Sequence, residues 1–388
     1  MSKLSRTQTL VIMAILFLLL VQIAVVIAGV SKGLQGRADF RTLYAGGYLV
    51  RTGHGDQLYD YDKTSAAESK FAGGLGANLP FNHPAFEAAL FAALSILSYK
   101  KAYCLFFVLN LGLLALAFRF LKLEESASVK WGVPAEALAM AGFLPVGICL
   151  IHGQDSILFF CIVAGCYALQ KIGKEFAAGL VLGLGLFRFQ LVIPLVLCLC
   201  FARKWKLLAG VAATGAVVAG ISIAITEPAP WMTYPRYLMA MNPGLQTESQ
   251  RFANAIRPLD MPNLRGLVQL LFGAMISPEE LKILTMVASA ALVVWAIVKR
   301  LRFELLIVVA VLVSYHGLIH DSVLLLLPLL RCGIPSTLEI GKRLAAWMLL
   351  ICPTIAFATF VPYAALAVVY LAFLIVIARP ETKQAAFT

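Results

Sequence analysis

Long, unbroken apolar runs are the feature that most constrains this chain. Leu10–Val30 is the first of them, and it follows a basic start that carries Lys3 and Arg6. A helix of about 20 apolar residues crosses a membrane. Hydrophobic residues make up 61% of the sequence and charged residues 13%, whereas a soluble domain carries about 25% charged residues. The sequence therefore excludes a soluble globular protein and predicts an all-α polytopic integral membrane protein.

The apolar runs predict about 12 membrane segments within a single integral membrane domain, 1–388. After Leu10–Val30 the expected segments are 102–118, 135–151, 156–170, 176–201 counted as two, 207–226, 281–298, 303–318, 321–335, 344–360 and 361–378. The count falls to 11 if 176–201 crosses only once. Two polar stretches remain as extracytoplasmic loops, a long first one over 31–99 and a second one over 227–280.

The run 176–201 sets the topology. Basic residues lie on both sides of it, Lys171 and Lys174 before and Arg203, Lys204 and Lys206 after. Since Lys and Arg collect in cytoplasmic loops, a short re-entrant-like hairpin that turns at Arg188 keeps both clusters inside. Each arm would then rise only about 16–20 Å at 1.5 Å per residue, which is short of a hydrocarbon core of roughly 30 Å. We expect both chain termini to be cytoplasmic.

Under this topology the polar chemistry collects on the outer face. All five histidines lie there, His54, His83, His152, His316 and His320, together with the carboxylates Asp39, Asp155 and Asp321. The predicted cytoplasmic loops hold no His and no Asp. The net charge of +12 is explained by orientation in the bilayer, so no nucleic-acid partner is expected.

Asp39 stands shortly after the first apolar run. Phe40, Leu43, Tyr44 and Gly47 follow it at helical spacing, which predicts an amphipathic helix lying at the membrane interface. A second interfacial stretch is expected over 85–97. Asp39 has two interpretations from position alone, an N-cap of the first helix or a catalytic carboxylate.

Three tight polar segments are further candidates. Pro84 forces His83 to be extended, so His83 is either a phosphate ligand or a turn residue. The turns His152–Asp155 and Tyr315–Asp321 join apolar segments, and polar groups so near hydrocarbon are usually paired or functional. Asp155 and Asp321 also suit helix N-caps. The spacing of His316 and His320 would fit a metal on a helix, but Gly317 argues for a turn instead.

Arg188 is the one basic residue deep within an apolar run. An intramembrane Arg is a functional hypothesis by default. Its partner is a lipid phosphate in one interpretation. In the other it pairs internally with Asp155 or Asp321.

Several short motifs, taken in order, resemble glycosyltransferase family 87. They are Asp39 after the first apolar run, Tyr44-Ala45-Gly46, Leu58-Tyr59-Asp60, Phe81-Asn82-His83-Pro84, Gly153-Gln154-Asp155-Ser156, the segment Gly179–Pro194 with Arg188-Phe189-Gln190, and Pro262-Asn263-Leu264-Arg265-Gly266. The resemblance runs from residue 1 to about 330. Family 87 belongs to the GT-C membrane glycosyltransferases and includes polyprenol-phosphate-mannose-dependent α-1,2-mannosyltransferases.

The resemblance implies a GT-C-like fold and a single-step, inverting transfer of a sugar from a polyprenyl phosphate on the outer face. Asp39 takes the role of general base. Donor-phosphate contacts map onto Arg188, His83, His320 and Gln190. The expected substrate-binding residues are Tyr44, Tyr59, His152, Gln154, Asp155, Asp321, Asn263 and Arg265. No cofactor is implied. GT-C sites often carry two adjacent acids early in the first outer loop, whereas this sequence has Ala38-Asp39, which leaves a divalent metal open but without support.

The expected partners follow from that mechanism. They are a polyprenyl-phosphate-linked sugar, with mannose or another hexose, a glycolipid or glycan acceptor, and membrane lipid. The expected location is a bacterial inner membrane with the active site facing the periplasm. A lipid-linked-sugar or small-molecule transporter or flippase is the main alternative, although no internal repeat supports it. A membrane phosphotransferase that uses the outer His and Asp residues is a weaker one.

Overall fold

A computed structural model describes residues 6–72, 79–122, 141–240, 257–333 and 340–378. Regular elements in these ranges are all helical, which confirms the all-α fold. The first half contains α1 (Arg6–Leu34), α2 (Phe40–Arg51), α3 (Tyr61–Ala72), α4 (Ala85–Ala92), α5 (Tyr99–Lys122), α7 (Leu144–His152) and α8 (Ser156–Lys171). The second half contains α9 (Glu175–Leu184), α10 (Phe189–Phe201), α11 (Trp205–Thr226), α12 (Pro228–Ala240), α14 (Leu264–Phe272), α15 (Pro278–Val298), α16 (Phe303–Val313), α17 (Leu326–Pro328), α18 (Ile340–Thr359) and α19 (Leu366–Ile377).

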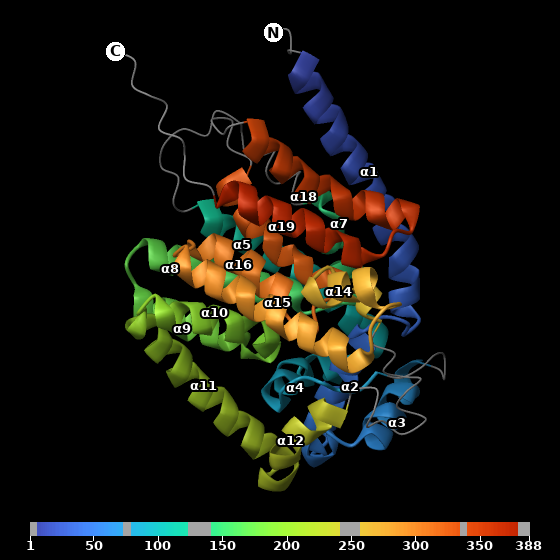
Figure 1. Cartoon of the computed structure of the whole chain (residues 1–388). Helices are drawn as coiled ribbons and strands as arrows, with labels where there is room; N and C mark the ends of the chain where they lie inside the picture. Colours follow the sequence, from blue (N-terminus) through green and yellow to red (C-terminus); the bar gives the residue numbers. More distant parts are fainter. Residues whose placement is uncertain (1–5, 73–78, 123–140, 241–256, 334–339, 379–388) are drawn as a thin grey trace.

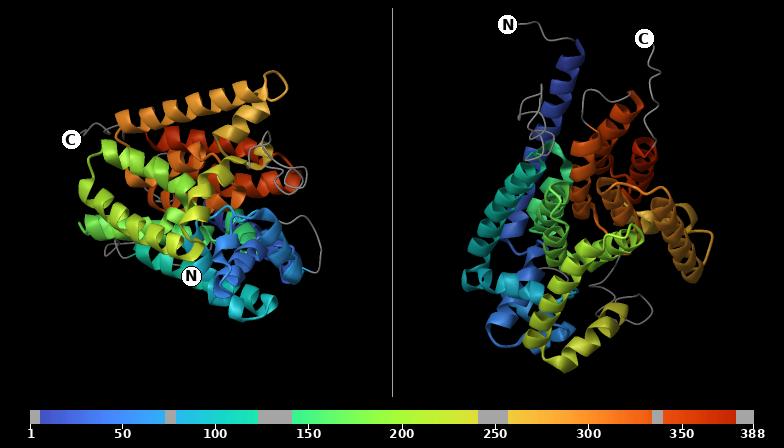
Figure 2. Two further views of the ribbon diagram at one scale, coloured as in Figure 1. Left: turned by 90° about the horizontal axis from the view of Figure 1, so that it is seen from below. Right: turned by 90° about the vertical axis from the view of Figure 1, so that its left-hand side faces the viewer.

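The helices form a bundle with a separate cap at one end. Helices α2, α3, α4 and α12 gather at the lower end of the molecule in Figure 1, and α1 begins at the opposite end. The side view in Figure 2 shows the same division. The cap is built from parts of the two stretches that the sequence predicts to be extracytoplasmic.

The count of about 12 membrane segments is not supported. Among the described residues six runs are long and apolar enough to cross a membrane, Leu16–Leu34, Tyr99–Leu121, Glu175–Phe201, Trp205–Thr226, Pro278–Val298 and Gly341–Thr359. Three further apolar helices are shorter, Ser156–Lys171, Phe303–Val313 and Tyr363–Ile377. Of the segment predicted over 135–151, residues 135–140 lie outside the described ranges, and α7 supplies only nine residues.

An apolar run alone does not establish a membrane span, because apolar runs also fill the interior of the protein. Helix α16 is buried continuously from Glu304 to Leu312, so its apolar surface contacts other helices all around. In the segment predicted over 321–335, residues 321–333 are a series of short pieces, a 3₁₀ turn η5 (Ile319–Leu325), α17 and a π turn (Leu329–Gly333), and residues 334–335 lie outside the described ranges. Hydropathy alone does not separate such core segments from spans.

The run 176–201 does fold back, as the sequence predicts. A 3₁₀ turn, η3 (Gly185–Arg188), separates α9 from α10. At the other end of the two arms, Lys204 Nζ lies 2.7 Å from Glu175 Oε1. A straight helix of that length would hold its ends about 40 Å apart. Although this run is one of the six long apolar ones, the chain reverses within it and places Arg188 at the tip.

Close helix packing holds this tip in place. Helix α11 follows the hairpin and lies against α9 (Figure 1). Glycines line the contact between the two helices. A side chain on Gly179 would collide with the backbone oxygen of Leu207, and one on Gly210 with that of Phe176. Glycine is therefore required where the two backbones approach, and the hairpin that carries Arg188 is rigidly placed.

The described residues of 31–99, the stretch predicted to be the first extracytoplasmic loop, pack against one another. Helix α2 is buried along Phe40–Gly47 and packs against α4 and α3. Phe40 is fully buried among the rings of Tyr99, Tyr103 and Phe106. The predicted helices are present. Protein covers α2 along most of its length, and its position at the membrane interface stays a prediction.

Candidate functional site

A cavity of about 450 Å³ lies where the cap meets the bundle, which is a usual size for a small-molecule site. Its polar lining includes residues far apart in the sequence, Asp39, Thr42, Asn82, His83, Gln154, Arg188, Gln190, Arg257, Asp260, Tyr315, His316 and His320. Phe187, Phe189, Leu238 and Leu318 are among the apolar residues of its wall. The fold thus brings six of the predicted site residues to the wall of one cavity, Asp39, His83, Gln154, Arg188, Gln190 and His320.

Asp39 precedes α2, and the residues that follow it in the chain hold it in place. Arg41 donates to Glu68 Oε2 at 2.9 Å and to the Gly36 carbonyl at 3.1 Å. Phe40 on the other side reaches Gly153, where an added Cβ would lie 2.7 Å from that of Phe40. Gly153 ends α7 with a φ of 58°, a conformation that favours glycine. This contact brings the α7–α8 turn onto Asp39.

The side chain of Asp39 is used for the site and not as a helix cap. It makes no capping hydrogen bond to α2. Its Oδ2 accepts a hydrogen bond from Gln154 Nε2 at 2.6 Å and lies 3.4 Å from His152 Nδ1. Burial by itself raises the pKa of Asp39. The hydrogen-bonding contact with His152 and the charges of His152 and His320 outweigh burial and lower this pKa to about 2. The carboxyl is therefore ionised at neutral pH.

Gln154 connects Asp39 to Arg188. Its Nε2 donates to the Asp39 carboxylate, and its Oε1 accepts from Arg188 Nη2 at 2.9 Å. The carboxylate accepts only and the guanidinium donates only, so these two partners fix the orientation of the amide. A base and a cation are thereby held at opposite ends of one side chain.

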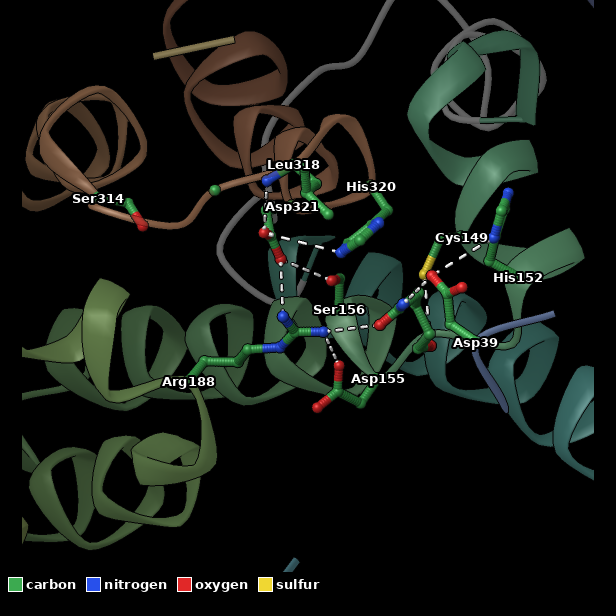
Figure 3. A network of polar contacts seen from close by, with 12 residues as sticks. Asp39, Cys149, His152, Asp155, Ser156, Arg188, Ser314, Leu318, His320 and Asp321 are labelled. Carbon is green, nitrogen blue, oxygen red and sulfur yellow. Dashed lines mark hydrogen bonds and ion pairs between the residues drawn. The ribbon is translucent and has the colours of Figure 1, made fainter. Parts of the chain in front are cut away.

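Arg188 is buried between two carboxylates. Figure 3 shows its guanidinium between Asp155 and Asp321. Nη2 donates to Asp155 Oδ1, and Nη1 lies 3.5 Å from Asp321 Oδ1. Ser156 Oγ donates to the same Asp321 oxygen at 2.8 Å. The internal pairing that the sequence left open for Arg188 is thus present, with both of the named carboxylates.

The two carboxylates differ from the expected N-caps. Asp155 precedes α8 but makes no capping hydrogen bond to it. Asp321 does accept from the Leu318 backbone N–H at 3.0 Å through Oδ2. Burial raises the pKa of each carboxyl, yet the Arg188 charge outweighs this and both pKa values are lowered. Asp155 and Asp321 do not line the cavity; they hold the arginine that does.

His83 leads to a second buried acid. Its Nδ1 lies 2.6 Å from Glu87 Oε2 and 4.0 Å from Asp155 Oδ2. Glu87 and Asp155 are fully buried. Burial, together with the nearby charge of Asp155, raises the pKa of Glu87 well above its usual value. Burial also lowers the pKa of His83 to about 4, so its ring is neutral at pH 7.

The other histidines divide between the cavity and the surface. His316 and His320 line the cavity, and burial lowers both pKa values, that of His316 to about 4. Among the described residues no third ligand joins them in a metal-binding group. His152 contacts Asp39 while its side chain is 43% exposed. His54 is exposed, its ring Nδ1 lies 3.1 Å from Thr52 Oγ1, and it is not among the residues that line the cavity.

Four other predicted residues have different positions. Gln190 lines the cavity. Tyr44 and Tyr59 are not among the residues that line the cavity. Their hydroxyls donate instead to the carbonyls of Leu97 and His83, respectively. Asn263 caps α14 by accepting from the Gly266 N–H and donates to the Ser314 carbonyl. The last three thus support the site from outside the cavity wall.

Arg265 does not line the cavity but contacts Tyr315, which does. Its Nη1 donates to the Tyr315 carbonyl at 3.1 Å, and its guanidinium lies 4.1 Å from the centre of the Tyr315 ring. It therefore orients a tyrosine that lines the cavity.

Glu87 is the residue that the sequence analysis missed. The signal was present, because Glu87 is the one charged residue of an apolar run over 85–97 and follows His83 by four positions. Residues four apart share a helix face, and an acid in an apolar segment is usually paired.

One comparison with known proteins identifies a family. The family model described as glycosyltransferase family 87 matches residues 81–328. No match was found among curated proteins or among solved structures. The matched range holds His83, Glu87, Gln154, Arg188 and His320 but begins after Asp39, so the position of Asp39 in the site rests on its contacts.

Proposed function

Because the chain belongs to glycosyltransferase family 87, we propose that it moves a hexose, mannose in the first instance, from a polyprenyl-phosphate donor to a glycolipid or glycan acceptor. Glycosyl transfer by a multi-pass membrane protein follows from the family and the apolar helices. The donor, the acceptor, the inverting mechanism and a periplasmic active site in a bacterial inner membrane are the proposal. The observation that carries it is the cavity where ionised Asp39 and Arg188 are joined through Gln154.

Asp39 suits the role of general base. An inverting displacement needs one carboxylate to take the acceptor hydroxyl proton as that oxygen attacks the anomeric carbon. Both contacts of Asp39 converge on Oδ2, and no described residue hydrogen-bonds to Oδ1. That oxygen is therefore available to an acceptor hydroxyl. His152, partly exposed beside the carboxylate, offers the proton a route to solvent.

The donor phosphate is assigned to the side of the cavity that holds Arg188. The leaving polyprenyl phosphate gains negative charge, which fixed donors stabilise. Arg188 Nε is buried and makes no hydrogen bond among the described residues, so one N–H remains for a ligand. His83 and His320 are neutral in the free protein, and each supplies an N–H donor or takes a proton when the phosphate arrives.

The apolar lining favours a lipid-linked donor over a soluble nucleotide sugar. Phe187 and Phe189 flank Arg188 at the cavity wall, and the hairpin that carries all three lies in an apolar run. A polyprenyl chain would reach this wall from the hydrocarbon region, while the sugar occupies the polar part of the cavity.

The test is a transfer assay on purified protein in lipid. Wild type and Asp39→Asn are incubated with a panel of radiolabelled polyprenyl-phosphate sugars and total membrane lipid from the host. Labelled product from wild type alone supports the proposal and names the sugar. If folded wild type binds a donor but moves it across a vesicle membrane without forming product, a flippase replaces the transferase. Label trapped covalently on His or Asp would indicate a phosphotransferase.

A further inference from the structure

The buried group formed by His83, Glu87 and Asp155 has more ligand atoms than partners. One atom from each, the His83 Nδ1 and one oxygen each of Glu87 and Asp155, lie within 4.8 Å of one another. Asp155 Oδ1 is used by Arg188, but Oδ2 is buried and has no hydrogen bond among the described residues. Neither oxygen of Glu87 accepts a hydrogen bond from a donor outside this group among the described residues; Oε2 lies 2.6 Å from the His83 Nδ1, and the carboxyl contacts that of Asp155. Buried acceptors without donors are rare and costly.

The charge around this group is also unbalanced. Glu87, Asp155 and Asp321 are each at most 1% exposed. Arg188 is the cation that the described residues place against them, and His83 is neutral. If all three were ionised, three carboxylates and one guanidinium would leave an excess of two buried negative charges. Burying unpaired charge is costly, so the group takes up either a proton, as the raised pKa of Glu87 indicates, or a cation that displaces it.

From this geometry we infer that His83, Glu87 and Asp155 form a site for one divalent cation of the Zn²⁺ or Mn²⁺ class. One imidazole and two carboxylates are ligands that these ions accept. When the ion displaces the proton of Glu87, its two charges together with that of Arg188 balance the three carboxylates. The present ligand separations of 2.6 and 4.0 Å from the His83 Nδ1 bracket the roughly 3.4 Å between ligands of a tetrahedral ion with bonds near 2.1 Å.

The site opens toward the cavity on one side. His83 lines the cavity and is partly exposed, whereas Glu87 and Asp155 lie behind it. A bound ion would therefore keep its remaining coordination positions on the cavity side. There it would add to the Arg188 charge and contact a phosphate oxygen directly; that role, unlike the binding itself, rests on the proposed function.

This inference differs from the metal position that the sequence suggested. His316 with His320 has no third ligand among the described residues, and Asp39 lacks a second acid beside it because residue 38 is alanine. The His83 group depends on Glu87, which the sequence analysis did not single out.

Metal binding is measured directly, without sugar. Full-length protein in lipid nanodiscs is stripped with a chelator, and the binding of Zn²⁺ and of Mn²⁺ is then measured by metal analysis and by electron paramagnetic resonance. We expect one ion per wild-type chain, at least a 100-fold loss of affinity in Glu87→Gln, and no competition from Ca²⁺, which prefers six to eight oxygen ligands. Bound ion should also raise the wild-type melting temperature by mass action.

Two variants make the result decisive. Glu87→Gln keeps the shape of the side chain and mimics protonated glutamate, so it should fold. Glu68→Gln is the matched control, a buried glutamate in the same cap that pairs with Arg41, and it should bind metal as wild type does.

Two outcomes would overturn the inference. Wild type that binds no ion would show that Glu87 is simply protonated. Equal binding by wild type and Glu87→Gln would place the ion elsewhere. In both cases the proposed glycosyl transfer still stands if sugar transfer continues in chelator. Conversely, if wild type binds the ion but transfers no sugar, the metal site stands and the proposed function fails.

Discussion

Asp39 and Arg188 are held in one hydrogen-bonded unit by the amide of Gln154, with contacts of 2.6 Å and 2.9 Å at its two ends. The two residues lie 149 positions apart in the sequence, one before α2 and the other at the tip of the α9–α10 hairpin. A proton acceptor and a phosphate-binding cation must have a fixed separation if both act on one glycosyl donor. The amide provides that separation.

Replacing Asp39 by Asn tests the base. Because the carboxylate makes no capping hydrogen bond to α2, Asp39→Asn should leave the melting temperature within about 2 °C of wild type. Loss of a general base typically costs about 10²–10⁴-fold in rate, so transfer should fall by at least that much. Initial rates and thermal unfolding in the same detergent are the measurements.

Asp60→Asn is the matched control for that experiment. Asp60 Oδ1 accepts from the backbone N–H groups of Asp62 and Lys63 at the start of α3, which makes it a true cap. Its loss should cost about 1 kcal/mol of stability and leave the rate almost unchanged. If Asp39→Asn behaves like Asp60→Asn, then Asp39 is structural.

Replacing Arg188 by Lys tests the phosphate contact. Lysine keeps the charge that balances Asp155 and Asp321, so the variant should fold, but it lacks the planar fork of five donors. The KM for the donor should rise about 10- to 100-fold, as expected for the loss of one or two charge-assisted hydrogen bonds, while the KM for the acceptor stays near that of wild type. An equal rise in both values would argue against a donor-specific role.

Arg188→Ala is expected to give a different result. It leaves two carboxylates buried without their cation, which typically costs about 3–5 kcal/mol. Denaturant or thermal unfolding should show a large loss of stability, and this variant is therefore unsuitable for kinetic comparison.

The pH profile tests the contact between Asp39 and His152. In wild type, His152 and His320 lower the Asp39 pKa to about 2 against the effect of burial, so Asp39 should cause no loss of activity down to about pH 4. In His152→Gln the burial effect remains and the largest lowering contact is gone. The pKa of Asp39 should then rise, and the acid limb of kcat/KM should move to higher pH. An acid limb that does not move would show that the two side chains are uncoupled.

The fold-back of the α9–α10 hairpin is open to chemical tests. Cysteines introduced at positions 175 and 204 replace an ion pair of 2.7 Å, so a short bifunctional reagent should cross-link them in nearly every chain. Membrane-impermeant labelling of cysteines at positions 173 and 205 should show both on the cytoplasmic side. Labelling from opposite sides would refute the predicted orientation, even if the cross-link forms.

Much of the site was visible in the sequence. The tight turns that carry Gln154, Asp155 and Asp321 stood out because polar residues next to apolar segments are costly, and Arg188 stood out as a lone cation within one. Their residue types predicted where chemistry would collect, and the internal pairing of Arg188 was one of two interpretations considered. The hairpin followed from basic residues at both ends of a single apolar run.

The sequence by itself thus determined the helical membrane class, the fold-back at Arg188 and the residues from which the site is drawn, because local composition and spacing carry that information. Tertiary structure alone decided which apolar helices are buried in the core, since burial depends on neighbouring helices and hydropathy does not. It likewise decided where each apolar run breaks, and therefore which helices are long enough to cross a membrane. It also decided that Asp39 faces Gln154 and is not a cap, and that Glu87 meets Asp155 behind His83. Such contacts between distant segments arise only when the chain has packed.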